Sequence, residues 1–181
     1  GAAQRRLAFQ SLMSQSALKQ GASAALFLLF RIANERFALK ATEVLEVLPR
    51  LPLKPIARAP AWVAGVFGHR GVVVPVIDLS ALAFGHPAQA RTSTRWVLVN
   101  YRPGQVLGLV LEQATDTLRC NPADFQPYGL DNPAARYLGP VRQDEEGLVQ
   151  WIRVADLLDD DVRGLLFPAQ ATGLDPLEAQ P

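Results

Sequence analysis

The sequence predicts a mainly all-β protein with two small antiparallel β-barrels, related by an internal repeat and accompanied by short helices. Two observations carry this prediction. Short apolar segments alternate with turn-forming residues about every ten positions, which is typical of small barrels. The two halves of the chain also align with each other. With 181 residues, 49% of them hydrophobic and 19% charged, the chain is long and apolar enough to build such a core.

The first half begins with a buried strand. Residues 26–32 are almost continuously apolar, which indicates a strand covered on both faces. Residues 33–36 are typical of a turn, and a second strand is predicted from Phe37. Residues 43–48 predict one helical turn followed by a third strand.

Four prolines then interrupt residues 49–60 and exclude a helix there. A strand is predicted over residues 62–67, a hairpin loop over 68–71 and a returning strand over 72–79. Pro75 in the returning strand has no N–H to donate, so this strand should lie at a sheet edge or carry a bulge.

The second half repeats this order of elements. Strands are predicted over residues 95–101 and 106–111, and after an irregular segment a hairpin is predicted from 137–142 and 148–154. Residues 155–161 are rich in acidic side chains and predict a short turn or helix.

The repeat is visible in the sequence itself. Residues 38–48 match 108–118 at a constant offset of 70, and Gly65 matches Gly139. Each predicted hairpin then returns to an Asp-Leu pair. These matches favour a duplicated barrel with a cleft or seam between the two copies. Chance similarity between two β-rich halves is the alternative.

The predicted boundaries are an N-terminal tail over residues 1–24, a domain over 25–167 and a C-terminal tail over 168–181. Met13 is the only methionine, so a native start there, after a vector-derived leader, is expected. The longest apolar run has seven residues, far fewer than the roughly 20 that cross a bilayer, and the N-terminal tail lacks the apolar region of a secretory signal. We therefore expect a soluble, cytoplasmic protein without direct membrane insertion.

The charge of the chain argues against nucleic acid as a partner. The formal net charge is +1, which is too small to gather phosphates, and most aromatic residues fall inside strand patterns. The sum hides an asymmetry, because residues 1–70 carry +7 and residues 71–181 carry −6. This polarity either orients a protein partner or forms two solvated faces.

No catalytic motif is present in the sequence. It lacks the dinucleotide-binding, phosphate-loop, serine-hydrolase, zinc-protease and paired-cysteine motifs. Cys120 is the single cysteine, so it cannot form an internal disulfide, and with two histidines it makes no zinc set. His69 and His86 are predicted to be solvated loop residues. We expect no enzyme, cofactor or metal; a phosphate cradle made by the backbone of residues 68–71 is the alternative.

One polar pair stands out in an apolar setting. Glu46 is the one acidic residue within an apolar segment, and Arg70 lies at the tip of a glycine-flanked hairpin. An arginine offers five donors in a planar fork, which suits a carboxylate on this chain or on a partner. An ordinary surface glutamate and an ordinary turn arginine are the alternative.

These residues belong to a longer pattern, in which a Pro-x-x-Val-x-Gly-Val segment precedes Arg-Gly and a Pro-Val-x-Asp-Leu strand. The segments that carry it are 27–30, 37–39, 44–47, 60–66, 69–79, 108–110, 137–139 and 157–158. In this order they resemble the CheW family of chemotaxis coupling proteins, over about residues 25–163.

The resemblance implies two five-stranded SH3-like barrels and a non-enzymatic adaptor. Family members join the cytoplasmic hairpin of a methyl-accepting chemoreceptor to the regulatory domain of a CheA-type histidine kinase, so both are implied partners. The family's receptor- and kinase-binding positions fall on Glu46 and Arg70, and Val44 and Gly65 also match positions tied to partner binding. The implied mode is a helix in a groove at the seam, plus docking of a barrel onto the kinase.

The chain departs from the family pattern at the hairpin. Gly68-His69 replaces the usual Asn-Leu before Arg-Gly, and Arg153 stands where an acid is expected. These departures imply a divergent member that serves a dedicated receptor cluster. Residues 37–67 are similar to the coupling proteins of Wsp-type surface-sensing systems, which implies a pathway that controls a diguanylate cyclase. A small-ligand-binding regulatory β-barrel protein is the alternative function.

Overall fold

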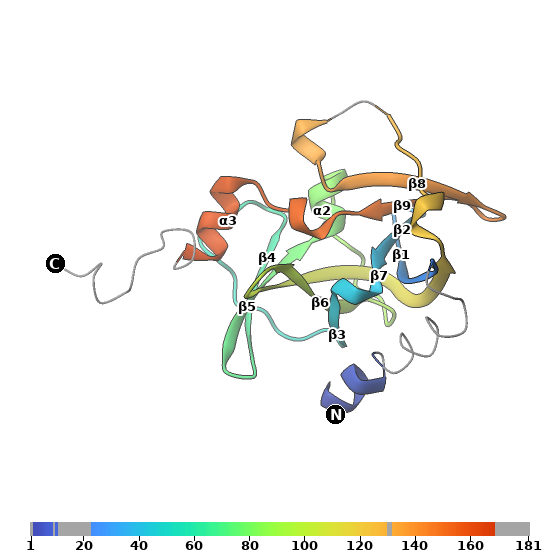
Figure 1. Ribbon diagram of the computed structural model, residues 1–181. Helices are drawn as coiled ribbons and strands as arrows, with labels where there is room; N and C mark the ends of the chain where they lie inside the picture. The colour runs from blue at the N-terminus through green and yellow to red at the C-terminus, as the bar shows by residue number, and fades with distance from the viewer. Residues whose placement is uncertain (1, 9, 11–22, 130–131, 169–181) are drawn as a thin grey trace.

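The computed structural model describes residues 2–8, 10, 23–129 and 132–168, and within them it contains nine strands with short helices between them (Figure 1). The strands are β1 (Ala25–Ile32), β2 (Glu35–Lys40), β3 (Val44–Leu48), β4 (Val63–His69), β5 (Val72–Asp78), β6 (Arg95–Arg102), β7 (Gln105–Cys120), β8 (Leu138–Asp144) and β9 (Gly147–Ile152). The helical turns are η1 (Ala41–Glu43), α2 (Leu79–Phe84), η2 (Pro122–Asp124), η3 (Pro133–Ala135), η4 (Val154–Asp156) and α3 (Asp160–Leu166). The mainly-β prediction is confirmed.

The strands form two five-stranded barrels, and each barrel takes strands from both halves of the chain. Barrel A contains β8, β9, β2, β1 and the last part of β7. Barrel B contains β3, β6, the first part of β7, β5 and β4. The β1–β2 hairpin of the first repeat therefore joins strands of the second repeat, and the β6–β7 hairpin joins strands of the first. Each barrel is therefore built from both copies of the repeat.

The strand registers reproduce the internal repeat. In barrel A, Phe27 lies opposite Leu118, and in barrel B, Trp96 lies opposite Leu48, so equivalent positions are about 70 residues apart. Each barrel also contains one parallel pair, β2 with β9 and β5 with β7. The predicted relation between the two barrels is confirmed by this matched pairing.

Strand β7 connects the two barrels. The sequence predicts a strand that ends at residue 111, but β7 continues to Cys120. The backbone of Gln113 is left-handed (φ 50°), and the register with β1 shifts between Leu29 and Arg31. This bend turns β7 from barrel B into barrel A without ending it (Figure 1).

Around β5 the structure confirms one local prediction and adds a helix that the sequence did not predict. Residues 72–75 pair only with β4, and pairing with β7 begins at Val76, so Pro75 lies at an edge as predicted. The helix α2 was not predicted. Its N-cap is Asp78, whose carboxylate accepts from the N–H of Ala81 at 3.1 Å, and it ends at Gly85 with φ 79°.

The larger apolar core is shared by the two barrels. It includes Phe30 and Phe37 from barrel A together with Val97 and Leu109 from barrel B, all at most 3% exposed. Burying these side chains against each other makes the barrels one packing unit rather than two separate domains.

The predicted tails are only partly described. Residues 2–8 are helical, and Ala2 packs against a smaller apolar cluster of barrel B that includes Phe67 and Trp96. Residues 1, 9, 11–22 and 169–181 of these tails lie outside the described residues. Among the described residues, none of the helices has the length and apolar character needed to span a bilayer.

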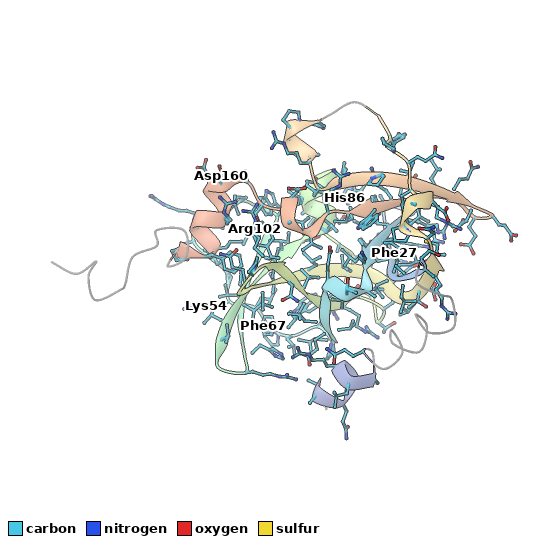
Figure 2. The ribbon with its side chains drawn as sticks, in the orientation of Figure 1. Phe27, Lys54, Phe67, His86, Arg102 and Asp160 are labelled. Carbon is cyan, nitrogen blue, oxygen red and sulfur yellow. The ribbon has the colours of Figure 1, made fainter. Side chains whose placement is uncertain are left out.

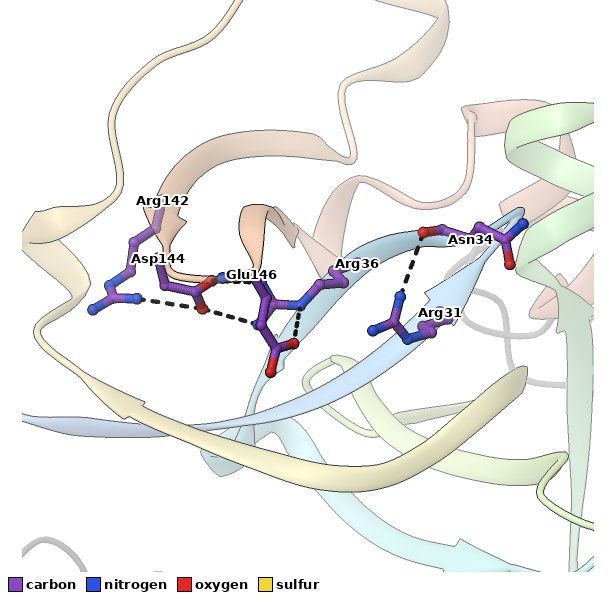
Figure 3. A network of polar contacts seen from close by, with 6 residues as sticks. All are labelled: Arg31, Asn34, Arg36, Arg142, Asp144 and Glu146. Atoms are coloured by element: carbon purple, nitrogen blue, oxygen red, sulfur yellow. Dashed lines mark hydrogen bonds and ion pairs between the residues drawn. The ribbon is translucent and has the colours of Figure 1, made fainter.

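An arginine–carboxylate clamp holds the β8–β9 hairpin of barrel A against β2. Arg36 donates to both carboxylate oxygens of Asp144, at 2.7 and 2.9 Å, and Arg142 lies 3.8 Å from the same carboxylate (Figure 3). The side chains of Arg36 and Asp144 are only 10% and 20% exposed. The hydrogen bonds from Arg36 lower the pKa of Asp144.

We expect Asp144→Asn to lower the free energy of unfolding by about 1.5–3 kcal/mol at neutral pH, because a charged bidentate contact is lost. Since the folded pKa of Asp144 lies below its unfolded value of 3.8, this stabilisation is fully present above that value. It is lost as the pH falls through the folded pKa. Urea unfolding of both proteins between about pH 3 and 7 measures this.

The matched control for this prediction is Asp124→Asn. Asp124 lies 4.0 Å from Arg142 and its side chain is 54% exposed, so its loss should change stability little. Equal effects of the two substitutions, or an Asp144→Asn effect that stays constant down to about pH 3, would contradict the role of the clamp.

Candidate functional site

Glu46 is an acidic side chain on the inward face of β3. Val44, Glu46 and Leu48 alternate with half-buried residues, so all three point inward. The side chain of Glu46 is only 3% exposed. A carboxylate at such a position needs hydrogen-bond donors, because an unpaired buried charge is strongly unfavourable.

The β4–β5 hairpin supplies these donors. His69 Nε2 lies 2.8 Å from Glu46 Oε2, and Arg70 Nη2 lies 3.3 Å from Oε1. Because a carboxylate only accepts hydrogen bonds, Nε2 carries the hydrogen in the His69 contact. Glu46 therefore binds two successive side chains of the β4–β5 hairpin, and these contacts fix the position of the hairpin over β3. The structure brings Glu46 and Arg70 together, so one carboxylate that Arg70 meets lies on this chain.

The hairpin turn is tighter than predicted. His69 pairs with Val72, so only Arg70 and Gly71 form the turn, and both have positive φ (54° and 79°). Two left-handed residues make the turn that matches the twist of a hairpin. This conformation is unfavourable for arginine by roughly 1–2 kcal/mol, and the contact with Glu46 helps to hold it. The Arg70 side chain nevertheless stays 45% exposed and available to a partner.

An apolar surface lies next to the Glu46–His69–Arg70 cluster. Val72 and Val73, just past the turn, are 58% and 69% exposed. On the other side of the hairpin, an open groove of about 560 Å³ is lined by Leu51, Pro52, Leu53, Lys54, Val66, Phe67 and Gly68. Figure 2 shows Lys54 and Phe67 at this end of barrel B. We call the hairpin tip and this groove together the hairpin surface. Exposed valines beside an oriented arginine are typical of a protein-binding surface.

The other two predicted site residues lie inside the protein. Val44 is 3% exposed and packs in the larger core, so its side chain supports β3 rather than facing solvent. Gly65 lies at a register shift in β4 with φ 145°. Next to it, Lys54 and Val66 exchange two backbone hydrogen bonds of 2.8 Å. Gly65 thus lets the proline-rich connection close against β4 and form one wall of the groove.

His69 is the functional neighbour that the sequence did not reveal. The sequence predicts a solvated loop histidine here, but the His69 side chain is only 19% exposed and is bound to Glu46. In the sequence, only its place directly before Arg70 could have indicated that His69 belongs to the site. His86, by contrast, is exposed, and lies near α2 (Figure 2). Among the described residues, no group of three or more His, Cys, Asp or Glu side chains could hold a metal ion.

The sequence of this chain is similar to those of known proteins. The CheW-like domain family matches residues 26–162. Protein FrzA of Myxococcus xanthus is 37% identical over 119 residues, which are 64% of this chain and 73% of FrzA. The chemotaxis protein CheW of Rhizobium meliloti (strain 1021) is 33% identical over 98 residues, 54% of this chain and 63% of that protein, so the chain spans less than two thirds of this relative.

The fold also matches a solved structure. The scaffolding protein TtCheW from Thermoanaerobacter tengcongensis superposes with a TM-score of 0.69 at 19% sequence identity, over 77% of this chain and 91% of that chain. The two barrels are therefore of the SH3-like kind that the resemblance implies. Because the family match covers most of the chain and both barrels, this protein belongs to the CheW-like domain family.

Proposed function

We propose that this protein is a non-enzymatic adaptor that couples the cytoplasmic hairpin of a methyl-accepting chemoreceptor to the regulatory domain of a CheA-type histidine kinase. The observation that carries the proposal is the hairpin surface, where Glu46 orients the half-exposed Arg70 beside two exposed valines and an open groove. Family membership and the names of the chemotaxis relatives agree with it.

The chemistry of the hairpin surface suits a helical partner with an acidic residue. The apolar groove and valines would supply contact area, and the planar fork of Arg70 would recognise a carboxylate and set the register. In this proposal Arg70 is the recognition residue, and the buried Glu46 holds its guanidinium in place. Val44 and Gly65 act indirectly, because they shape β3 and the wall of the groove.

Arg70→Ala should weaken binding to at least one of the two partners by about 1–3 kcal/mol, roughly five- to 150-fold, because a charged hydrogen bond is lost at a half-exposed site. Titration calorimetry with a receptor hairpin and a kinase regulatory domain from the same genome measures this. Arg119→Ala is the matched control, since Arg119 is an exposed arginine of barrel A.

Binding to neither partner by a folded wild-type protein would reject the coupling function. Binding that Arg70→Ala and Arg119→Ala leave equally unchanged would keep the coupling function but reject the hairpin surface as its site. A ligand-dependent rise in melting temperature without partner binding would favour the small-ligand alternative.

We also propose that the adaptor serves a surface-sensing pathway with a diguanylate cyclase as its output, at membrane receptor clusters in the cytoplasm. The support is the Wsp-like segment over residues 37–67, together with the Glu46–His69 contact at a position where the family usually carries leucine. Deleting the gene should lower cyclic di-GMP in surface-grown cells and leave swimming chemotaxis intact. Loss of swimming chemotaxis alone would assign the protein to the main chemotaxis pathway.

A further inference from the structure

A polar depression lies away from the hairpin surface, where three connections meet. The β1–β2 turn, the segment after α2 and the bend of β7 enclose a volume of about 170 Å³. This equals the volume of roughly six water molecules, which suffices for one small oxyanion and its hydration. The polar side chains that line it include Arg31, Asn34, Ser80, His86, Arg91 and Glu112.

Two guanidinium groups in the depression lack a carboxylate partner. Arg31 Nη1 donates to the backbone carbonyl of Asn34 at 3.5 Å, a weak contact with a neutral group (Figure 3). Arg91 Nε donates to the neutral Gln89 Oε1 at 2.7 Å, which orients the guanidinium. Within the described part of the chain, neither group lies within 4.0 Å of a carboxylate oxygen. Both positive charges are therefore available to an anion.

Neutral polar groups complete the lining. Ser80 is 2% exposed, and its hydroxyl donates to the carbonyl of His86 at 2.8 Å and lies 3.4 Å from Nδ1 of the same residue. The one carboxylate, Glu112, accepts from the backbone N–H of Gln89 at 2.5 Å. With two arginines against one glutamate, the depression carries a net positive charge.

The equivalent place in the other barrel is closed. There Arg102 Nη2, on β6 beside the β6–β7 turn, donates to the carbonyl of Ala155 in η4 at 3.0 Å. The Tyr101 ring stacks on Phe167, just past α3, with ring centroids 5.9 Å apart. Figure 2 labels Arg102. The duplicated fold thus does not require a polar opening at this position. Where the second repeat has the stacked rings of Tyr101 and Phe167, the first repeat has two arginines, a serine and a histidine.

We propose that this depression binds a phosphate group, either free or as a small phosphomonoester, between Arg31 and Arg91. The oxyanion would accept hydrogen bonds from both guanidiniums and compensate their charge. Because Arg31 belongs to β1 of barrel A and Arg91 to the segment between α2 and β6 of barrel B, the ligand would fasten the two barrels together.

Calorimetric titration of the full chain with inorganic phosphate and with glycerol 2-phosphate, at constant ionic strength, tests this. We expect saturable binding to one site in the wild-type protein. Arg31→Gln and Arg91→Gln should each weaken it about tenfold or more, since each removes a charged hydrogen bond. Glu112→Gln should strengthen it, because the substitution keeps an acceptor for Gln89 and removes the like charge.

The control is Arg119→Gln, which removes the same charge from an exposed position on β7. Absence of saturable binding at millimolar concentrations of either phosphate would overturn the proposal. So would an equal loss of affinity in the Arg31, Arg91 and Arg119 variants, because this would indicate a general charge effect. Tighter binding of the monoester than of free phosphate would identify the ligand as a phosphomonoester.

Discussion

Gly65→Ala is expected to lower the free energy of unfolding by about 3 kcal/mol or more, which is a fall of about 10 °C in melting temperature for a domain of this size. An added Cβ would lie 2.5 Å from the backbone oxygen of Lys54. The backbone at Gly65 also has φ 145°, a conformation that other residues rarely adopt. Neither problem can be relieved by rotating a side chain, because both involve the backbone.

The matched control is Gly68→Ala in the same strand. A Cβ on Gly68 would meet no atom within 4 Å, and its φ is not positive. Thermal and urea unfolding of the two variants measure the difference. If Gly65→Ala unfolds within about 1 kcal/mol of Gly68→Ala, the close approach of Lys54 does not constrain the fold.

Gly65→Asp should be worse, since it adds an unpaired charge next to the same carbonyl. A substitution at Gly65 should therefore displace Lys54, which forms part of the wall of the groove. A loss of partner binding in either variant would follow from this displacement, so it should be accompanied by a loss of stability. Lost binding with unchanged melting would mean that Gly65 contacts a partner directly.

The strands themselves could be predicted because their signals are local. The apolar run around Phe30, the turn at Asn34 and the edge proline Pro75 each act through neighbouring residues. Which strands pair depends instead on contacts between distant segments. The pairing of Leu48 with Trp96, and of Phe27 with Leu118, exchanges the hairpins between barrels, and a repeat pattern is equally compatible with either arrangement.

For the candidate site, too, residues with a local sequence signal could be predicted and residues that depend on distant contacts could not. Glu46 could be singled out because a lone acid in an apolar strand is unusual, and Arg70 because glycines flank its turn. His69 could not be assigned, because only the folded hairpin places its ring against the carboxylate. Nor could the sequence distinguish the buried role of Val44 from a contact role, since a valine in a strand suits both.

The second large effect is expected for Glu46→Ala, which should lower stability and should weaken partner binding by releasing the Arg70 side chain. Glu46→Ala leaves Arg70 and His69 without their shared acceptor and opens space beneath the hairpin, so we expect a loss of about 1–3 kcal/mol in unfolding free energy. Arg70→Ala should cost less stability, because the Arg70 side chain is 45% exposed whereas that of Glu46 is 3% exposed. Urea unfolding compares the two variants.

Binding of the receptor hairpin and of the kinase domain should then show that the two residues act as one unit. Each single substitution should weaken binding by about 1–3 kcal/mol, and the double variant should bind about as weakly as the single variant with the larger loss. We expect this because Glu46, only 3% exposed, would hold the guanidinium of Arg70 in the orientation that meets the partner without meeting the partner itself. Effects that multiply in the double variant would mean that Glu46 and Arg70 contribute independently, and that the arginine finds its partner without the buried carboxylate.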